Sequence, residues 1–348
     1  MGQETTSPFI VDVLELRDTS FQVGYKTGLI LKGKPVLTAL GGMVKPEIDI
    51  FSMQDIFSAY APHLLEELQG LAEALNLSFE KAAALLSGYD LPKVDAMGCS
   101  AILTKDYYVR NYDFSSILYD GIFSMIQAKG SYSSAGYNLQ AIGRHDGVNE
   151  HGLVAGLHFV SNEGHTKGLC AWSSLRIVLD TCSSLEEAVH LLKEIPHAAC
   201  YNFSISDGSG NLAVVEAGPE RVLVRTDEEY LTCVNHFQHD DLSEKNRPQL
   251  DGSKKRDLEM HRLQKKGMSH EDMAAYFANR NSPLFFKDYS DLFGTLHTFS
   301  YSWSNKRLIT SVAQSNDALD IDFGDWVRGT NIDRKQLYGM IEENASES

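Results

Sequence analysis

The spacing of apolar residues divides the chain into two parts. In the first part, Phe9–Leu16 alternates between apolar and polar residues as a strand does, and the apolar residues of Leu64–Leu75 recur every three or four positions, which predicts a helix. A second short helix is predicted over Ser78–Leu86. Because this stretch is rich in apolar residues, we expect residues 1–98 to be an integral N-terminal segment that packs against the rest of the protein.

From Cys99 onward, short runs of β-branched and aromatic residues predominate, which is typical of strands. We predict strands at Cys99–Leu103, Tyr107–Tyr112, Phe123–Lys129, Gly152–Phe159, Phe203–Ser206, Leu212–Glu216, Arg221–Arg225 and Tyr230–Asn235, and a closing hairpin of Thr295–Tyr301 with Leu308–Val312. We predict helices at Trp172–Leu179, Ser184–Lys193, Lys254–Lys266 and Glu271–Ala278. Strands in blocks, with helices between and after them, predict an α+β architecture for residues 99–348.

Composition narrows the class of protein. The chain has 348 residues, 43% of them hydrophobic, so it can bury a large core in one or two domains. A net charge of −16 argues against nucleic acid or an anionic membrane surface as the main partner. No apolar stretch is long enough to span a bilayer, and five cysteines without a Cys-x-x-Cys pair favour a reducing, cytoplasmic setting. These features leave a homo-oligomer open.

The stretch with the most chemical information begins at Gly98-Cys99 and ends with the Arg-Asn-Tyr-Asp run at Arg110–Asp113. A thiol attacks a carbonyl only as its thiolate, so it needs a nearby positive charge or a base. The two segments predict a hairpin with a two-residue turn, in which Cys99 pairs with Tyr112. Alternation along the strand then places Arg110 on the same face as Cys99.

Opening of the peptide bond between Gly98 and Cys99 would supply the base. The new α-amino group of Cys99 would titrate at about 7.7–8.0, near the pH at which a general base works best. Asp113 follows Arg110 by three residues, so a regular strand cannot point both side chains to one face. Either Asp113 holds the new amine at the main chain, or the strand bulges near Asn111.

Two later segments offer hydrogen-bond donors. Acyl transfer needs donors aimed at the negative oxygen that forms when a carbonyl is attacked. The side-chain amide of Asn235, at the end of a predicted strand, can supply one donor, and an exposed backbone N–H can supply another. The run Asp146–Phe159, a turn that leads into a buried strand, contains His158.

Together these residues resemble the N-terminal-nucleophile hydrolases, and within them the branch that joins choloylglycine hydrolases and penicillin V acylases to the acyl-CoA:6-aminopenicillanate acyltransferases. The resemblance rests on Gly98-Cys99, Arg110–Asp113, the Asn-Glu-x-Gly-Leu run with its following Gly-Leu at 149–157, and Asn235. It implies a four-layer αββα sandwich and autocatalytic cleavage into two chains that stay together. Residues 1–98 would be the bound light chain, and residues 99–348 the catalytic domain.

The resemblance also implies a role for each site residue. Cys99 would be the nucleophile, with its own α-amine as base, and Asp113 would orient that amine. Arg110 would support the thiolate. Asn235 would donate to the oxyanion through its side chain, and His158 would donate through its backbone N–H.

One departure from the family pattern concerns a second arginine. The family usually places it near the strand that corresponds to Thr295–Tyr301, where this sequence has none. Arg280 and Arg307 are the nearest arginines, and neither matches well. The later half of the site is therefore open.

The sequence thus predicts an autoprocessing cysteine amidohydrolase or acyltransferase that acts on a small acyl-amide or acyl-thioester through an acyl-Cys99 intermediate, without a metal or organic cofactor. His236 and His239 do not offer the arranged ligands and supporting shell that zinc needs. Two alternatives stay open. An unprocessed chain would be a binding or scaffolding protein with a relic site. A Cys/His hydrolase would keep Cys99 internal and use His236 or His297 as its base.

Overall fold

The computed structural model describes residues 5–93, 98–289 and 293–343. Its helices are α1 (Ser20–Leu31), α2 (Pro35–Gly41), α3 (Ile50–Tyr60), α4 (His63–Leu75), α5 (Phe79–Leu86), α6 (Ala171–Thr181), α7 (Leu185–Glu194), α8 (Asp251–Gln264), α9 (His270–Ala278) and α10 (Phe323–Val327), with 3-10 turns at Ser116–Leu118 and Asp240–Lys245. Its strands are β1 (Thr5–Asp18), β2 (Gly98–Thr104), β3 (Tyr107–Phe114), β4 (Ile122–Ala128), β5 (Ser134–Leu139), β6 (Gly143–Asn149), β7 (Val154–Ser161), β8 (Cys200–Ser206), β9 (Leu212–Ala217), β10 (Val222–Thr226), β11 (Tyr230–Cys233), β12 (Lys287–Asp288), β13 (Phe293–Ser302), β14 (Arg307–Val312), β15 (Leu319–Asp322) and β16 (Gln336–Glu343).

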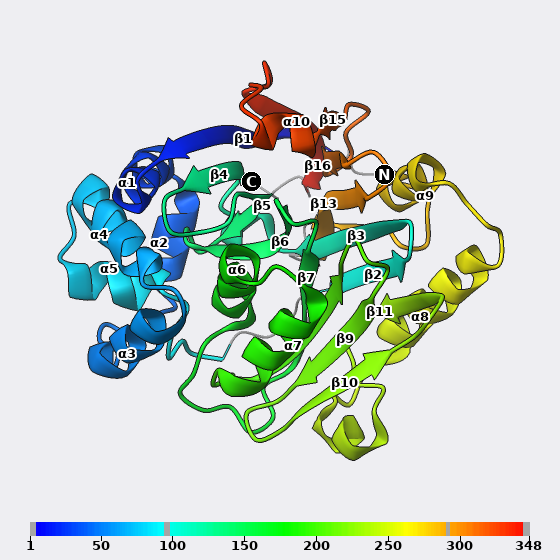
Figure 1. Cartoon of the computed structure of the whole chain (residues 1–348), viewed down its shortest axis with the longest axis horizontal. Helices are drawn as coiled ribbons and strands as arrows, with labels where there is room; N and C mark the ends of the chain where they lie inside the picture. Colours follow the sequence, from blue (N-terminus) through cyan, green and yellow to red (C-terminus); the bar gives the residue numbers. More distant parts are fainter. Residues whose placement is uncertain (1–4, 94–97, 290–292, 344–348) are drawn as a thin grey trace.

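Two sheets stack on one another in the middle of the molecule. Within the described residues, the first sheet has nine strands in the order β10-β9-β8-β7-β6-β5-β4-β1-β16, and the second runs β11-β2-β3-β13-β14-β15 with β12 on β13. Helices α6 and α7 lie on the first sheet, α8 and α9 lie on the second, and β2 contacts β7 and β8 across the interface between them (Figure 1). These layers form the αββα sandwich that the family resemblance implied.

The N-terminal segment contributes to the first sheet as well as to a helical group. Strand β1 is an interior strand, parallel to β4 on one side and antiparallel to β16 on the other. Helices α1 to α5 gather at one end of the molecule (Figure 1). The segment before residue 94 is therefore built into the sheet and cannot leave without opening it.

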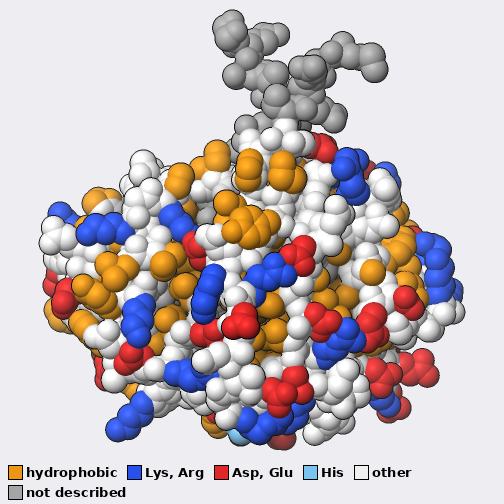
Figure 2. Space-filling model, turned by 90° about the horizontal axis from the view of Figure 1, so that it is seen from above, with side chains coloured by type: hydrophobic (Ala, Val, Ile, Leu, Met, Phe, Trp, Pro, Cys, Tyr) orange, Lys and Arg blue, Asp and Glu red, His pale blue; other side chains and the backbone are white. Residues whose placement is uncertain are grey.

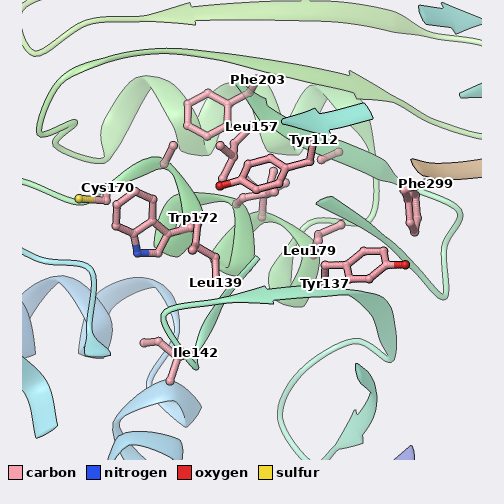
Figure 3. Packing of buried hydrophobic residues seen from close by; sticks show 14 of the residues in the cluster. Tyr112, Tyr137, Leu139, Ile142, Leu157, Cys170, Trp172, Leu179, Phe203 and Phe299 are labelled. Atoms are coloured by element: carbon pink, nitrogen blue, oxygen red, sulfur yellow. The ribbon is translucent and has the colours of Figure 1, made fainter. Parts of the chain in front are cut away.

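Large apolar side chains fill the space between the sheets. Tyr112 and Phe299 of the second sheet belong to the same cluster as Tyr137, Leu157 and Phe203 of the first, and all five are fully buried (Figure 3). Strands whose two faces are both covered lose the alternation of polar and apolar residues. The interface therefore offers a dry environment in which any polar group must find a partner.

The surface carries mixed charge. Basic side chains stand among acidic ones on the face seen from above (Figure 2). Over the part of the chain that the structure describes, no helix combines the length and apolar character needed to cross a bilayer. In the same residues, no group of three or more histidine, cysteine, aspartate or glutamate side chains is arranged to hold a metal ion.

Candidate active site

Cys99 is the second residue of β2, in a hairpin with β3. The register pairs Cys99 with Tyr112 and Ala101 with Arg110, as the two-residue turn predicted. Cys99 is fully buried, and its sulfur accepts a hydrogen bond from Nη2 of Arg110 at 3.2 Å. The prediction that Arg110 and the thiol share one face of the strand is confirmed.

Arg110 is held by more than the thiol. Its Nη1 donates to Oδ2 of Asp146 at 2.5 Å, and its Nη2 also donates to the carbonyl of Leu157. Burial opposes the charge of Arg110, but Cys99 and Asp146 outweigh burial, and the pKa of Arg110 lies above its ordinary value. Burial raises the pKa of the Cys99 thiol, and the nearby Arg110 reduces this shift without reversing it. In the uncut chain the thiol therefore keeps its proton and needs a base.

Asp113 points to the other face of β3. Its Oδ1 accepts a hydrogen bond from Oγ1 of Thr295 at 2.7 Å, and its Oδ2 lies 3.9 Å from Nη1 of Arg256. The ladder between β2 and β3 is regular, so the strand does not bulge near Asn111. Burial raises the pKa of Asp113 to about 6, against the opposing effects of Arg256 and Thr295. Its Oδ2 has no hydrogen-bond partner among the described residues.

Gly98 has no room for a side chain. A Cβ atom there would lie 2.3 Å from the ring of Phe293 and 3.0 Å from Cβ of Asp113. The glycine before the cysteine therefore lets Asp113 pack directly against the peptide that leads into Cys99. Residues 94–97, which precede it, lie outside the described residues.

Asn235 faces the main-chain nitrogen of Cys99. Its Oδ1 accepts hydrogen bonds from that nitrogen at 2.7 Å and from Nη2 of Arg256 at 3.0 Å. Its Nδ2 donates to the carbonyl of Phe159 at 2.8 Å. Two donors on one side and an acceptor on the other define the orientation of the amide. In the uncut chain, Asn235 thus positions Cys99 through its oxygen.

Arg256 is the functional candidate that sequence reasoning missed. It lies in the first turns of α8 and donates to the carbonyl of Cys99 and, at 3.0 Å, to Oγ of Ser100. Arg280 and Arg307, the nearest candidates in the sequence, pair instead with acidic residues at the surface. The helix around Arg256 was predicted, but no local pattern marks it as a neighbour of Cys99. Only the packing of α8 on β2 and β11 brings it there.

His158 lies on β7, next to the site. The carbonyls of Leu157 and Phe159 accept hydrogen bonds from Arg110 and Asn235. Neighbouring residues of a strand direct their backbone groups to opposite edges, so the backbone of His158 is directed toward β8. The N–H of Phe159 shares the direction of its own carbonyl and is therefore a second candidate for the donor role predicted for His158.

The two histidines considered as alternative bases have other partners. His297 hydrogen-bonds Asp146 through Nε2 at 2.8 Å and the hydroxyl of Tyr119 through Nδ1 at 2.8 Å. His236 hydrogen-bonds Oγ of Ser253 through Nδ1 at 2.8 Å. Both nitrogens of His297 are thus engaged away from the sulfur.

The Asn-Glu-x-Gly-Leu run shapes the turn between β6 and β7. Oδ1 of Asn149 accepts hydrogen bonds from the N–H groups of His151 and Leu153, and its Nδ2 donates to two carbonyls at the end of α6. Gly152 adopts a φ of 79°, a left-handed conformation that favours glycine. This run therefore serves the fold, and it leads β7 past the thiol.

The four-layer αββα sandwich is the fold of the N-terminal-nucleophile hydrolases. The chain belongs to the acyl-coenzyme A:6-aminopenicillanic acid acyl-transferase family, whose sequence model matches residues 102–317. The match begins just after Cys99 and includes the other site residues. The chain is accordingly an enzyme of the linear-amide hydrolase or N-acyltransferase class. None of the curated proteins matches the sequence significantly.

Solved structures resemble the chain at low sequence identity. A variant of conjugated bile acid hydrolase from Clostridium perfringens is 15% identical, with a TM-score of 0.43 over 73% of this chain and 98% of that one. Penicillin V acylase from Agrobacterium tumefaciens is 15% identical, with a TM-score of 0.35 over 65% and 78%. The Caenorhabditis elegans ortholog of N-acylethanolamine-hydrolyzing acid amidase is 12% identical, with a TM-score of 0.41 over 59% and 93%.

Proposed function

We propose that the chain is cut before Cys99 and then works as a cysteine N-terminal nucleophile that cleaves or transfers the acyl group of a small acyl-amide or acyl-thioester. One observation carries the proposal. The sulfur of Cys99 is held by Arg110 and its main-chain nitrogen by Asn235, so both atoms that the chemistry needs are positioned separately. A plain core cysteine needs no such support.

The maturation step opens one bond. The sulfur of Cys99 adds to the carbonyl of Gly98 while the thiol proton passes to the departing nitrogen, so the C–N bond breaks and leaves a thioester and the free α-amine of Cys99. Water then hydrolyses the thioester to a carboxylate at Gly98 and the thiol of Cys99. The amine has more N–H groups than the amide it replaces. Oδ2 of Asp113, which accepts no hydrogen bond from the described residues of the uncut chain, would accept one from the amine, since Asp113 packs against Gly98.

The mature site would then turn over by acyl transfer. The neutral amine of Cys99 takes the thiol proton, and the sulfur attacks the substrate carbonyl, while Arg110 stabilises the thiolate. We infer that Asn235 and a backbone N–H of β7 donate to the oxyanion. The leaving group takes the proton, acyl-Cys99 remains, and water or an amine releases the acyl group.

The N-terminal piece would stay bound after the cut. Its strand β1 lies between β4 and β16, and its helix α4 is joined to α6 by a buried ion pair and a buried hydrogen bond. Glu67 of α4 binds Arg176 of α6 through both carboxylate oxygens, at 2.7 and 3.2 Å, and His63 of α4 lies 2.8 Å from Asp180 of α6. Removing this piece would leave Arg176 without Glu67 and Asp180 without His63.

The hydrogen bonds of the histidines favour this proposal over a Cys/His hydrolase. The base would have to reach the thiol, and His297 and His236 are bonded to Asp146 and Ser253 instead. A relic site without processing is less favoured because Arg110, Asn235 and Arg256 all surround one cysteine.

Intact-mass analysis of the purified protein tests the proposal. We expect two pieces of 98 and 250 residues, and an added acyl group on the larger one after exposure to an acyl-amide probe. Cys99→Ala should remain one chain and lose turnover roughly 10⁵-fold or more. Cys182→Ala, a buried cysteine at the end of α6, should be cut and acylated normally. An active enzyme that is one unbroken polypeptide would refute the proposal.

A further inference from the structure

Behind Arg110 lies a buried group that the proposed mechanism leaves unused. Oδ2 of Asp146 joins Nη1 of Arg110 at 2.5 Å to Nε2 of His297 at 2.8 Å, and His297 in turn bonds the hydroxyl of Tyr119 at 2.8 Å. We call Arg110, Asp146 and His297 the thiol triad. All three side chains are fully buried.

The thiol triad crosses the interface between the sheets. Arg110 and His297 lie on neighbouring strands of the second sheet, whereas Asp146 lies on β6 of the first. Asp146 therefore anchors the arginine from the opposite layer. A guanidinium is a rigid planar fork, so holding Nη1 also sets the direction of Nη2. That Nη2 is the atom that donates to the sulfur of Cys99.

We propose that Asp146, supported by His297, is a positioning residue that aims Arg110 at the sulfur of Cys99 and limits how strongly its charge stabilises the thiolate. This inference rests on the proposed function of Cys99 as nucleophile. Asp146 does not touch the sulfur and acts through Arg110.

Several buried polar atoms in or near the thiol triad have no hydrogen-bond partner within the part of the chain that the structure describes. Among the described residues, these include Nε of Arg110, Oδ1 of Asp146, the hydroxyl of Tyr112 and both ring nitrogens of His145. The rings of Tyr112 and His145 lie 3.9 Å apart, between centroids. Native interiors leave few such atoms, and those that remain call for a specific explanation such as a catalytic role or bound water. Oδ1 of Asp180 is unpaired among the described residues as well, so the contact of Arg110 with the sulfur of Cys99 is what sets the thiol triad apart from an ordinary structural ion pair.

The direction in which Asp146 shifts the pKa of the Cys99 thiol follows from the charged and titratable groups around the thiol. These groups are Arg110, Tyr112 and Asp113 of β3, His158 of β7, Cys233 of β11, Arg256 of α8 and, through Arg110, Asp146 of β6 and His297 of β13. Burial alone would raise the pKa of Asp146, but His297 and Arg110 outweigh it, and the carboxyl stays ionised. Its negative charge opposes the help that Arg110 gives to the thiolate.

Two substitutions should shift the pH midpoint for alkylation of the Cys99 thiol in opposite directions. Asp146→Asn removes the opposing charge, so the pH midpoint for alkylation of Cys99 by iodoacetamide should fall by about one pH unit. His297→Phe keeps the ring stacked on Tyr137 but removes the donor to Asp146, so the midpoint should rise. His297→Gln, which keeps an N–H, should stay near the wild-type midpoint.

Asp180→Asn is the matched control. Asp180 also joins a buried arginine to a histidine, yet it lies on α6, in the outer helical layer. It should lower the free energy of unfolding as Asp146→Asn does, without moving the alkylation midpoint. Asp146→Asn should also lower kcat by roughly 10- to 100-fold with little change in KM, because Arg110 loses the carboxylate that holds it against the sulfur of Cys99.

The outcome separates the two proposals. Alkylation is assigned to Cys99 by peptide mass, so its pH profile can be read in a cut or an uncut chain. An uncut but active wild type would refute the proposed maturation, whatever the profiles show. Equal midpoints in wild type, Asp146→Asn and His297→Phe would refute the positioning role of Asp146, even if the enzyme matures as proposed.

Discussion

Two aspartates in the interior each join an arginine to a histidine, and the comparison between them separates chemistry from structure. The two groups are the thiol triad, Arg110–Asp146–His297, and a second group, Arg176–Asp180–His63. In both, one oxygen of the aspartate lies 2.5 or 2.6 Å from the arginine and 2.8 Å from the histidine. The pKa of each aspartate is lowered and that of each arginine is raised, so electrostatics alone does not distinguish the groups.

The second partner of the arginine makes the difference. The two Nη atoms of Arg176 donate to Glu67 on the N-terminal segment. We call Glu67, Arg176, Asp180 and His63 the clasp. Arg110 turns its other nitrogen to the thiol of Cys99, which is neutral until a base removes its proton. An arginine whose donors all meet carboxylates or carbonyls serves structure. An arginine with a donor held against a buried thiol is ready to stabilise a charge that appears during reaction.

The clasp should affect stability most. Arg176→Met leaves Glu67 and Asp180 buried without their cation, so the free energy of unfolding should fall by about 3–5 kcal/mol. Chemical denaturation measures the loss, and Arg307→Met, which breaks exposed pairs, should change stability by about 1 kcal/mol or less. The comparison would break if Arg176→Met abolished turnover in protein that is still folded.

The largest effect at the site after loss of the nucleophile should come from Asn235. Asn235→Ala removes a predicted oxyanion donor, so kcat should fall about 100- to 1000-fold. Asn149→Ala removes an equally buried amide that serves the β6–β7 turn, and it should lower stability while kcat per folded molecule changes little. Steady-state rates normalised to the folded fraction distinguish the two. Full turnover in Asn235→Ala would contradict the assigned role.

The smallest expected effect is a pH dependence set by Asp113. Its pKa of about 6 lies above the ordinary value of 3.8, so the carboxylate that should orient the amine is lost as pH falls below 6. Activity should then decline about tenfold per pH unit. Asp113→Asn should be weakly active, and its activity should not show this decline below pH 6. Asp120→Asn should keep the decline, because Asp120 has a similar pKa but bonds the backbone of Gln140 and Ala141.

Stability should depend on Asp113 with the opposite sign. A carboxyl whose pKa is raised in the folded state favours folding below its unfolded pKa, and this contribution is lost as pH rises through about 6. The ionised form that the mechanism needs is therefore the form that the fold disfavours. Denaturation of wild type and Asp113→Asn at pH 4 and pH 8 should show a pH-dependent difference of this sign, and a difference that does not vary with pH would contradict it.

The sequence pattern does not predict strands β5 and β6, and the reason is the same for both. Strands β5 and β6 are buried on both faces, and β5 is a Ser-Ala-Gly-Tyr-Asn-Leu run with no β-branched residue. The residue pattern predicts a turn from Asp146 onward, whereas the structure continues β6 to Asn149 before turning. The pattern therefore does not mark Asp146 as a site residue. No local pattern shows that a residue of one sheet will reach an arginine of the other.

The sequence by itself determined what depends on near neighbours. The β2–β3 register and the shared face of Cys99 and Arg110 follow from turn length and strand alternation. Only the tertiary structure decided that Arg256 meets Cys99 and that Asp146 holds Arg110. The physical reason is distance along the chain: these contacts form when a helix and two sheets close on a common core, and the buried charges can be met only by partners that other layers bring.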